Sequence, residues 1–139
     1  MMPIPSTEGP HLVQWMPGKV KAGFPSPAED FAMERIDLDE ILMTHPQATF
    51  FMRVSGDSME SFGIFNDDVL VINKGKHARS GQIVLVDIDG QFMVKQFIEH
   101  HGQVKFRAGN PTYPDIVPKN GQSAKEWGVV VATVKVFPT

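Results

Sequence analysis

The chain has 139 residues, 42% of them apolar, and a formal net charge of -3 at pH 7. This length supports one globular body, and the absence of cysteine excludes a disulfide framework, a thiolate zinc site and a cysteine nucleophile. The 13 Lys and Arg residues are scattered, so we expect no direct sequence-specific DNA binding. No segment predicts a signal peptide or a membrane span, which indicates a cytoplasmic protein without a membrane anchor.

The first 27 residues are rich in proline and glycine, with six prolines and three glycines. We expect residues 1–27 to form a flexible, extended arm in which neither a helix nor a β-ladder persists. Trp15 and Met16 in this arm have two open interpretations, since they suit an anchor to the body as well as a contact with a partner.

Residues 28–47 predict a connector with one short helix. Asp37 is placed to cap a helix through Leu38, Ile41 and Leu42, and Pro46 is expected to end it.

From residue 48 the pattern changes to short apolar and β-branched runs. Together with 11 prolines and 12 glycines in the whole chain, they predict a mainly β fold, with one compact β domain over residues 48–139. The expected strands are residues 48–54, 69–73, 82–88, 91–98, 104–107 and 127–137.

The dipeptide Asp89-Gly90 predicts a two-residue hairpin turn of type I′. In that register Val84 faces Lys95 on one side of the ribbon, and Val86 and Met93 share that side. Apolar neighbours disfavour the charged form of Lys95 and lower its pKa, as a lysine that accepts a proton requires. Because buried lysines are rare, a lysine that snorkels at the sheet edge fits the same pattern.

Ser58 follows an apolar strand at a Gly-Asp turn. Such a junction can expose a serine beside free backbone N–H groups, here those of Asp57 and Ser58, which are suited to hold an oxyanion. Gly-Asp-Ser is also a common turn composition, so this segment alone does not identify a nucleophile.

Several segments of the chain form one ordered pattern: AGFPSP at 22–27, RIDL at 35–38, SGDSM at 55–59, DVLV at 68–71, GQIV at 81–84, VK at 94–95 and GVV at 128–130. In order and spacing these segments resemble the LexA-like family of self-cleaving serine proteases, and within it the SOS mutagenesis proteins of the UmuD type. The resemblance implies a signal-peptidase-like β domain in which Ser58 is the nucleophile, Lys95 is the general base and the bond between Ala22 and Gly23 is cut. Small residues at the cut suit a tight pocket.

Two positions depart from the family pattern. Asp67-Asp68 stands where the family usually has Gly-Asp, so Asp67 is expected to accept a positive φ, which Asp tolerates better than most residues. Ala22 stands where UmuD-type proteins often have Cys, a difference expected to affect the rate of cleavage more than its specificity.

The adjacent histidines His100 and His101 suggest a metal site. Neighbouring residues of a strand point to opposite faces, and no further ligand has a suitable spacing, so we expect no metal and no cofactor. A Ser-His-Asp triad built from one of the five histidines stays open as an alternative to Ser-Lys.

The resemblance implies a homodimer, stimulation by a RecA filament on single-stranded DNA, and a UmuC-type Y-family polymerase subunit as partner of the shortened chain. A self-cleaving repressor of the LexA or phage type is one alternative. Such repressors place a DNA-binding domain before the cut, and we expect the 22 residues that precede it here to be too few for one. Signal peptidase, the second alternative, uses the same dyad but needs a membrane anchor, which this sequence does not predict. A non-enzymatic β interaction module, in which Ser58 and Lys95 are incidental, is the third alternative.

Overall fold

The structure, a computed structural model, describes residues 4–5, 12–15, 22–23, 34–42, 46–119 and 121–139. The chain divides into two compact units, one formed by Met1–Thr7 with His45–Thr139 and the other by Glu8–Thr44, and each is described by itself. The predicted division at residues 27 and 47 stays a prediction. Within the described part of the chain, none of the helices has the length and apolar character that crossing a membrane requires.

The smaller unit contains a short antiparallel ladder. Strand β2 (Leu12–Trp15) pairs with β3 (Glu34–Asp37), and helix α1 (Leu38–Leu42) follows directly. The prediction that no ladder persists in the first 27 residues is therefore wrong at β2, because this tetrapeptide is free of Pro and Gly and contains strand-favouring Val and Trp. It is also wrong at β1 (Ile4–Pro5), which pairs with residues 50–51 at the edge of the larger sheet, a position where proline is tolerated. The predicted short helix after Asp37 is confirmed, whereas Met16 lies outside the described residues.

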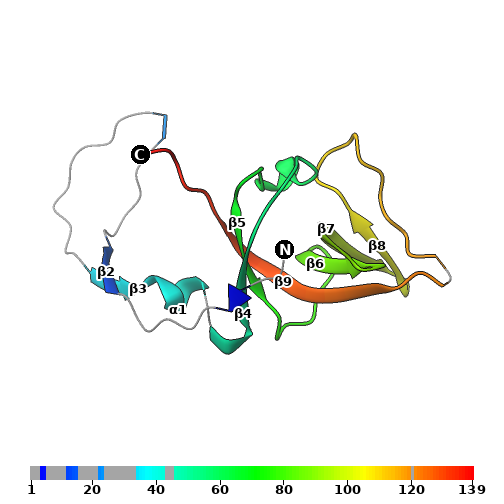
Figure 1. Cartoon of the computed structure of the whole chain (residues 1–139), viewed down its shortest axis with the longest axis horizontal. Coiled ribbons are helices and arrows are strands. Elements are labelled where there is room, and N and C mark those ends of the chain that lie inside the picture. Colours follow the sequence, from blue (N-terminus) through cyan, green and yellow to red (C-terminus); the bar gives the residue numbers. More distant parts are fainter. Residues whose placement is uncertain (1–3, 6–11, 16–21, 24–33, 43–45, 120) are drawn as a thin grey trace. The chain divides into compact units, whose positions relative to one another are not determined.

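The larger unit is built on one antiparallel sheet of seven strands, which confirms the mainly β fold (Figure 1). Two 3-10 helices flank β4 (Thr49–Arg53) in the sequence: η1 (Pro46–Ala48) directly precedes it, and η2 (Glu60–Phe62) follows it. All six predicted strands are present within a few residues of their expected ends. In sheet order the strands are β1 (Ile4–Pro5), β4 (Thr49–Arg53), β5 (Val69–Asn73), β9 (Ala124–Val134), β6 (Ile83–Ile88), β7 (Gln91–His100) and β8 (Gln103–Arg107).

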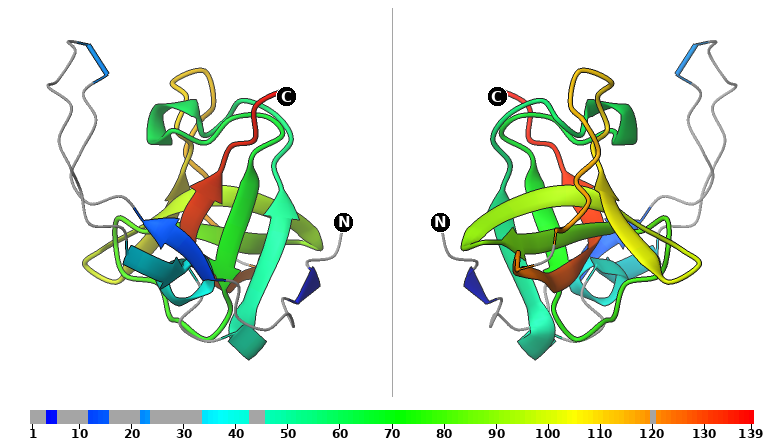
Figure 2. Two further views of the ribbon diagram at one scale, coloured as in Figure 1. Left: turned by 90° about the vertical axis from the view of Figure 1, so that its left-hand side faces the viewer. Right: turned by 90° about the vertical axis from the view of Figure 1, so that its right-hand side faces the viewer.

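Strand β9 lies in the middle of this sheet, between β5 and β6, and its register shifts against both. At Gly128 a Cβ would stand 2.6 Å from Cγ2 of Ile72, so the strands approach one another more closely than a side chain permits. Bulges increase the local twist. Figure 2 shows the result, a coiled sheet in which β6 and β7 run across the direction of β4 and β5.

The core forms on both faces of β6, because successive side chains of a strand point to opposite sides. Leu85 belongs to one buried cluster with Met59, Ile64, Leu70 and Ile72. Its neighbours Val84 and Val86 belong to a second cluster with Ile88, Phe97 and Phe106. Two covered faces explain why the first four residues of β6, 83–86, are all apolar.

The predicted hairpin is confirmed in its turn and its register. Asp89 and Gly90 both have positive φ, 51° and 86°, as a type I′ turn requires. Val84 pairs with Lys95 and Val86 with Met93. The hairpin therefore carries Lys95 on the same face as the second buried cluster.

Candidate active site

Lys95 is a buried lysine on β7. Its exposed fraction is 8%, and the paired residue Val84 is fully buried. Burial lowers the pKa of Lys95 below its ordinary value of 10.5, because removal from water penalises the ammonium. Of the two predicted interpretations, the structure supports the buried lysine over the snorkelling one.

Ser58 lies in the turn that follows β4. The turn begins where Gly56 takes φ 98°, in the left-handed region that glycine tolerates, and the Gly56 N–H donates to Oδ1 of Asn66 at 2.9 Å. Immediately after Ser58 the side chain of Met59 enters the first core cluster with 2% exposure. The core therefore holds one side of the turn and leaves the half-buried Ser58 at the surface of the sheet.

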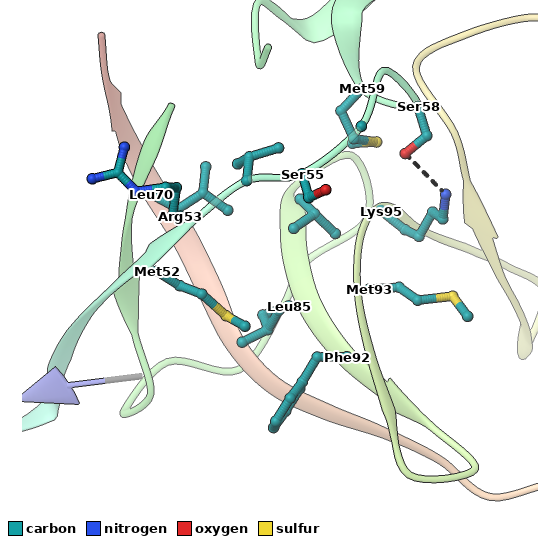
Figure 3. A pocket seen from close by; sticks show the side chains of 13 residues that line it. Met52, Arg53, Ser55, Ser58, Met59, Leu70, Leu85, Phe92, Met93 and Lys95 are labelled. Carbon is teal, nitrogen blue, oxygen red and sulfur yellow. Dashed lines mark hydrogen bonds between the residues drawn. The ribbon is translucent and has the colours of Figure 1, made fainter. Parts of the chain in front are cut away.

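The two side chains point toward one another (Figure 3), and Lys95 Nζ donates to Ser58 Oγ at 3.3 Å. The structure thus brings together two predicted site residues that are 37 positions apart in the chain. This separation is slightly longer than the 2.6 to 3.2 Å, roughly, of a working base and nucleophile, a difference common without bound substrate. A deprotonated Lys95 at this position can accept the hydroxyl proton of Ser58.

At Asp57 and Ser58 the backbone carbonyls accept hydrogen bonds, whereas the N–H groups find no acceptor in the described part of the chain. The Ser58 carbonyl accepts from the Gly109 N–H at 2.6 Å, and the Asp57 carbonyl accepts from Nδ2 of Asn110 at 3.1 Å. The N–H groups of Asp57 and Ser58 have no acceptor among the residues that the structure describes. Free donors beside a nucleophile are what an oxyanion requires.

Two hollows meet at Ser58 and Lys95. The first, a cleft of about 400 Å³, runs between the end of β4 and the start of β7, and its apolar wall includes Met52, Leu85 and Phe92 (Figure 3). The second, of about 390 Å³, lies on the other side and is bounded by Tyr113, Pro114 and Ile116. A peptide that reached Ser58 would therefore find space on both sides of its hydroxyl.

Sequence reasoning missed the contribution of residues 108–116. Besides Gly109 and Asn110, this segment supplies Tyr113, whose hydroxyl donates to Oδ1 of Asp57 at 2.6 Å. The Tyr113 ring centroid lies 5.7 Å from Lys95 Nζ. The only signal in the sequence was the turn-forming composition Asn-Pro-Thr-Tyr-Pro, which does not indicate a contact with a turn more than fifty residues away.

The Asp67-Asp68 pair, which departs from the family pattern, has the backbone conformation expected for it. Asp67 has φ 70°, which confirms the expected positive φ. Asp68 is buried at 2% exposure, and its carboxylate accepts from Lys135 Nζ at 2.6 Å, the Phe65 N–H at 2.9 Å and Thr133 Oγ1 at 3.3 Å. The bond from Lys135, followed by the one from Phe65, lowers the pKa of Asp68 below its ordinary 3.8.

The two adjacent histidines do not behave as neighbours on one strand. β7 ends at His100, and His101 begins the following turn with φ 51°. Their rings pack edge to face with centroids 4.0 Å apart. The prediction that they point to opposite faces is wrong, because the strand ends between them. No group of three or more potential metal ligands gathers within the described ranges.

The predicted cleavage residues belong to the smaller unit. Ala22 and Gly23 form a bend, and both are exposed. A side chain added at Gly23 would meet no atom within 4 Å. The bond between them is thus open to approach from solvent.

Comparisons with known proteins agree with this geometry. The family model "Peptidase S24-like" matches residues 14–131. The chain is 38% identical to Protein SamA of Salmonella typhimurium over 81% of its own length and 78% of that protein's. It is 33% identical to Protein MucA of Escherichia coli over 92% and 88%, respectively. It is also 34% identical to the LexA repressor of Shewanella woodyi, over 85% of this chain and 58% of the repressor. The chain belongs to the Peptidase S24-like family of self-cleaving serine peptidases, among its UmuD/MucA-type members.

Proposed function

We propose that this chain is a serine-lysine autoprotease that cuts its own bond between Ala22 and Gly23, with Ser58 as nucleophile and Lys95 as general base. The observation that carries the proposal is the 3.3 Å approach of Lys95 Nζ to Ser58 Oγ by a lysine that is only 8% exposed. A desolvated lysine loses its proton at lower pH than an exposed one, which makes it available as a base.

The chemistry proceeds in two steps under this proposal. Neutral Lys95 takes the proton of Ser58 as Oγ bonds to the carbonyl carbon of Ala22, and the N–H groups of Asp57 and Ser58 hold the resulting oxyanion. The C–N bond then breaks, and the amine of Gly23 leaves with the proton from Lys95. Water, deprotonated by Lys95, attacks the acyl ester, which returns the proton to Ser58 and releases the carboxylate of Ala22.

The cleft beside β7 suits an extended substrate. β8 pairs with β7 only from Gln96 onward, so the outer edge of residues 91–95 has no strand partner within the described part of the chain. A free edge can accept an added strand through main-chain hydrogen bonds. The arm that contains Ala22 and Gly23 is the substrate we propose for this edge.

The proposed cellular role follows the similarity to SamA and MucA. A RecA filament on single-stranded DNA would stimulate the cut by favouring the conformer in which the arm occupies the cleft, without adding a catalytic group. The shortened chain would act as a homodimer with a UmuC-type Y-family polymerase subunit in error-prone synthesis during the SOS response. These partners act in the cytoplasm, where the proposal therefore locates the chain.

The similarity to the LexA repressor favours a second candidate, self-cleavage that regulates transcription. The two candidates differ in whether the intact chain binds operator DNA. Fluorescence anisotropy with labelled operator duplexes separates them, since the first candidate predicts no sequence-dependent binding before or after the cut.

The test is incubation of the purified chain at increasing pH, with N-terminal sequencing of the product. We expect a fragment that begins at Gly23, formed faster at alkaline pH and faster again with RecA, ATP and single-stranded DNA. Ser58→Ala and Lys95→Ala should each abolish the fragment. The matched controls Ser61→Ala and Lys76→Ala change exposed residues of the same types and should cleave normally. If no condition produces the fragment, the proposal is wrong, and cleavage that survives either active-site substitution removes that residue from the mechanism.

A further inference from the structure

Residues 108–116, here called the Tyr113 loop, are fastened to β8 at their C-terminal end. Ile116 exchanges backbone hydrogen bonds with Phe106, both at 2.8 Å. Asp115 forms ion pairs with Lys105 at 3.4 Å and with Arg107 at 3.7 Å. The loop therefore leaves the sheet and returns to it at a defined place.

At its N-terminal end the same loop is hydrogen-bonded to residues 58–61, in and directly after the turn that contains Ser58. Gly109 donates to the Ser58 carbonyl at 2.6 Å and accepts from the Ser61 N–H at 2.7 Å. A Cβ at Gly109 would lie 2.5 Å from the ring of Phe62 and 3.0 Å from Cα of Met59. The two backbones are thus in direct contact, and the rest of the loop is held next to Ser58 and Lys95.

Tyr113 is the residue of the loop that reaches both halves of the site. Its hydroxyl donates to the Asp57 carboxylate at 2.6 Å, and the carboxylate raises the pKa of Tyr113 above its ordinary 10.0. Its ring centroid lies 5.7 Å from Lys95 Nζ, and Tyr113 and Lys95 line the same hollow. One side chain therefore binds Asp57 and lies beside Lys95.

We propose that Tyr113 is a positioning residue for the cleavage reaction: its ring shields Lys95 from water, and its hydroxyl fixes the orientation of Asp57 so that the free N–H groups face the cleft. This inference rests on the proposed autoprotease function and extends it to a residue that contributes no proton and no bond to the reaction. The two roles belong to different parts of the side chain, so they can be separated by substitution.

The ring has two opposing effects on Lys95. An aromatic face attracts the ammonium and thereby favours the charged form, but this effect weakens near the limit of roughly 6 Å, and the ring of Tyr113 lies at 5.7 Å. Shielding from water favours the neutral form, and burial is the cause of the lowered pKa of Lys95 in the described structure. The charged groups around the site are Asp57, which Tyr113 binds, Glu60, whose charge also raises the pKa of Tyr113, and Arg53, which lines the first hollow together with Lys95. β6 pairs Val84 with Lys95, and Met93 of β7 lines both hollows. The proposal is that shielding outweighs attraction, and we therefore expect loss of the ring to raise the pKa of Lys95.

The experiment compares Tyr113→Phe, which keeps the ring, with Tyr113→Leu and Tyr113→Ala, which remove it. Val117→Ala, an exposed position beyond the loop, is the control. The first readout is the titration of Lys95 by NMR of ¹³C-labelled lysine, in full-length protein that carries Ser58→Ala and so stays intact. The second is the pH profile of the self-cleavage rate in the background with Ser58.

We expect Tyr113→Phe to leave the Lys95 titration unchanged and to lower the limiting rate at alkaline pH about tenfold, because the bond to Asp57 is lost. Tyr113→Ala and Tyr113→Leu should raise the pKa of Lys95 by about half a unit to one unit and move the pH profile by the same amount, so that the rate near neutral pH falls a further threefold to tenfold, roughly. Val117→Ala should change neither readout.

A merely structural role would lower the limiting rate and the melting temperature of all three variants without moving the Lys95 titration, and that result would overturn the inference. Tyr113→Leu keeps apolar bulk and thus the fold, so an unchanged Lys95 titration in this variant would also overturn the inference. If the parent protein cleaves nothing while the ring-less variants still shift the Lys95 titration, the proposed function is wrong and the shielding by Tyr113 is supported. Cleavage by the parent with no effect of any Tyr113 variant overturns the inference alone.

Discussion

The hairpin that carries Lys95 and the turn that carries Ser58 are positioned in different ways. β6 and β7 form a regular ladder in which each residue from Ile83 to Ile88 has a partner. The turn that contains Ser58 has no ladder. It is held by single hydrogen bonds with Asn66, Gly109, Asn110 and Tyr113 and by the packing of Met59 in the core. Many equivalent bonds make the position of Lys95 insensitive to any one of them, whereas the position of Ser58 depends on a few long-range contacts.

The largest difference between the two regions should appear when each is disturbed by one side chain. Gly109→Ala places a Cβ 2.5 Å from the Phe62 ring and pushes the loop away from the Ser58 turn. We expect self-cleavage to fall by about a hundredfold, because misplacement of a nucleophile by about 1 Å has effects of this size. The rate of appearance of the Gly23 fragment measures this.

The matched substitution in the hairpin is Ile88→Ala, at a buried position directly before the Asp89-Gly90 turn. It should destabilise the fold by about 2 to 5 kcal/mol in chemical denaturation, as large-to-small core substitutions do. Cleavage by the folded fraction should nevertheless stay within about threefold of the parent, since the ladder holds Lys95. Similar losses of cleavage in both variants would contradict the distinction between the two regions.

A second difference concerns proton chemistry, since only the hairpin carries a titrating group of the mechanism. Below the pKa of Lys95 the fraction of neutral amine rises about tenfold per pH unit, and the cleavage rate should rise with the same slope. Because burial lowers that pKa, the rate should level off below pH 10.5, the ordinary value for lysine. The self-cleavage rate of the unsubstituted protein, measured as a function of pH, gives both the slope and the plateau. A rate that does not change with pH would exclude Lys95 as the base.

The smallest expected effect concerns Asp68, the residue directly before β5, which binds the Phe65 N–H and Lys135. The pKa of Asp68 is lower in the folded state, so its contribution to stability is present above pH 3.8, the ordinary value, and is lost as pH falls through the folded pKa. Lys135→Met removes the principal cause of this shift.

We therefore expect Lys135→Met to lower the thermal stability at neutral pH and to reduce the further loss between neutral pH and pH 3. Lys76→Met, at an exposed lysine, is the control and should keep the parent's acid dependence. Melting curves followed by circular dichroism across this pH range measure the effect. An acid dependence in Lys135→Met as steep as the parent's would show that this ion pair contributes nothing to stability.

The predictable parts of the molecule are those governed by local rules. Asp89-Gly90 predicts a turn, the turn predicts the register, and the register predicts the neighbours of Lys95, all from residues within one hairpin. The strand boundaries followed from the apolar runs in the same way. The short ladder at Leu12–Trp15 was missed because the density of proline around it outweighed four residues with strand character.

The unpredictable parts depend on contacts between distant segments. No local rule connects Tyr113 with Asp57, or indicates that the last strand lies between β5 and β6. His101 shows the same limit on a smaller scale, since one residue beyond the end of a strand reversed the expected direction of a side chain. Ser58 itself was recognised from the family resemblance, because Gly-Asp-Ser has no distinctive local pattern.

The central place of β9 has a consequence for the synthesis of the protein. β4 leads into Ser58 and β7 carries Lys95, and in the sheet the two halves are joined only through β9, which ends at Val134. Pairing between segments distant in sequence forms late in folding. A nascent chain on the ribosome therefore contains both side chains long before the sheet brings them together. Under the proposed function, self-cleavage would begin only after β9 has been translated.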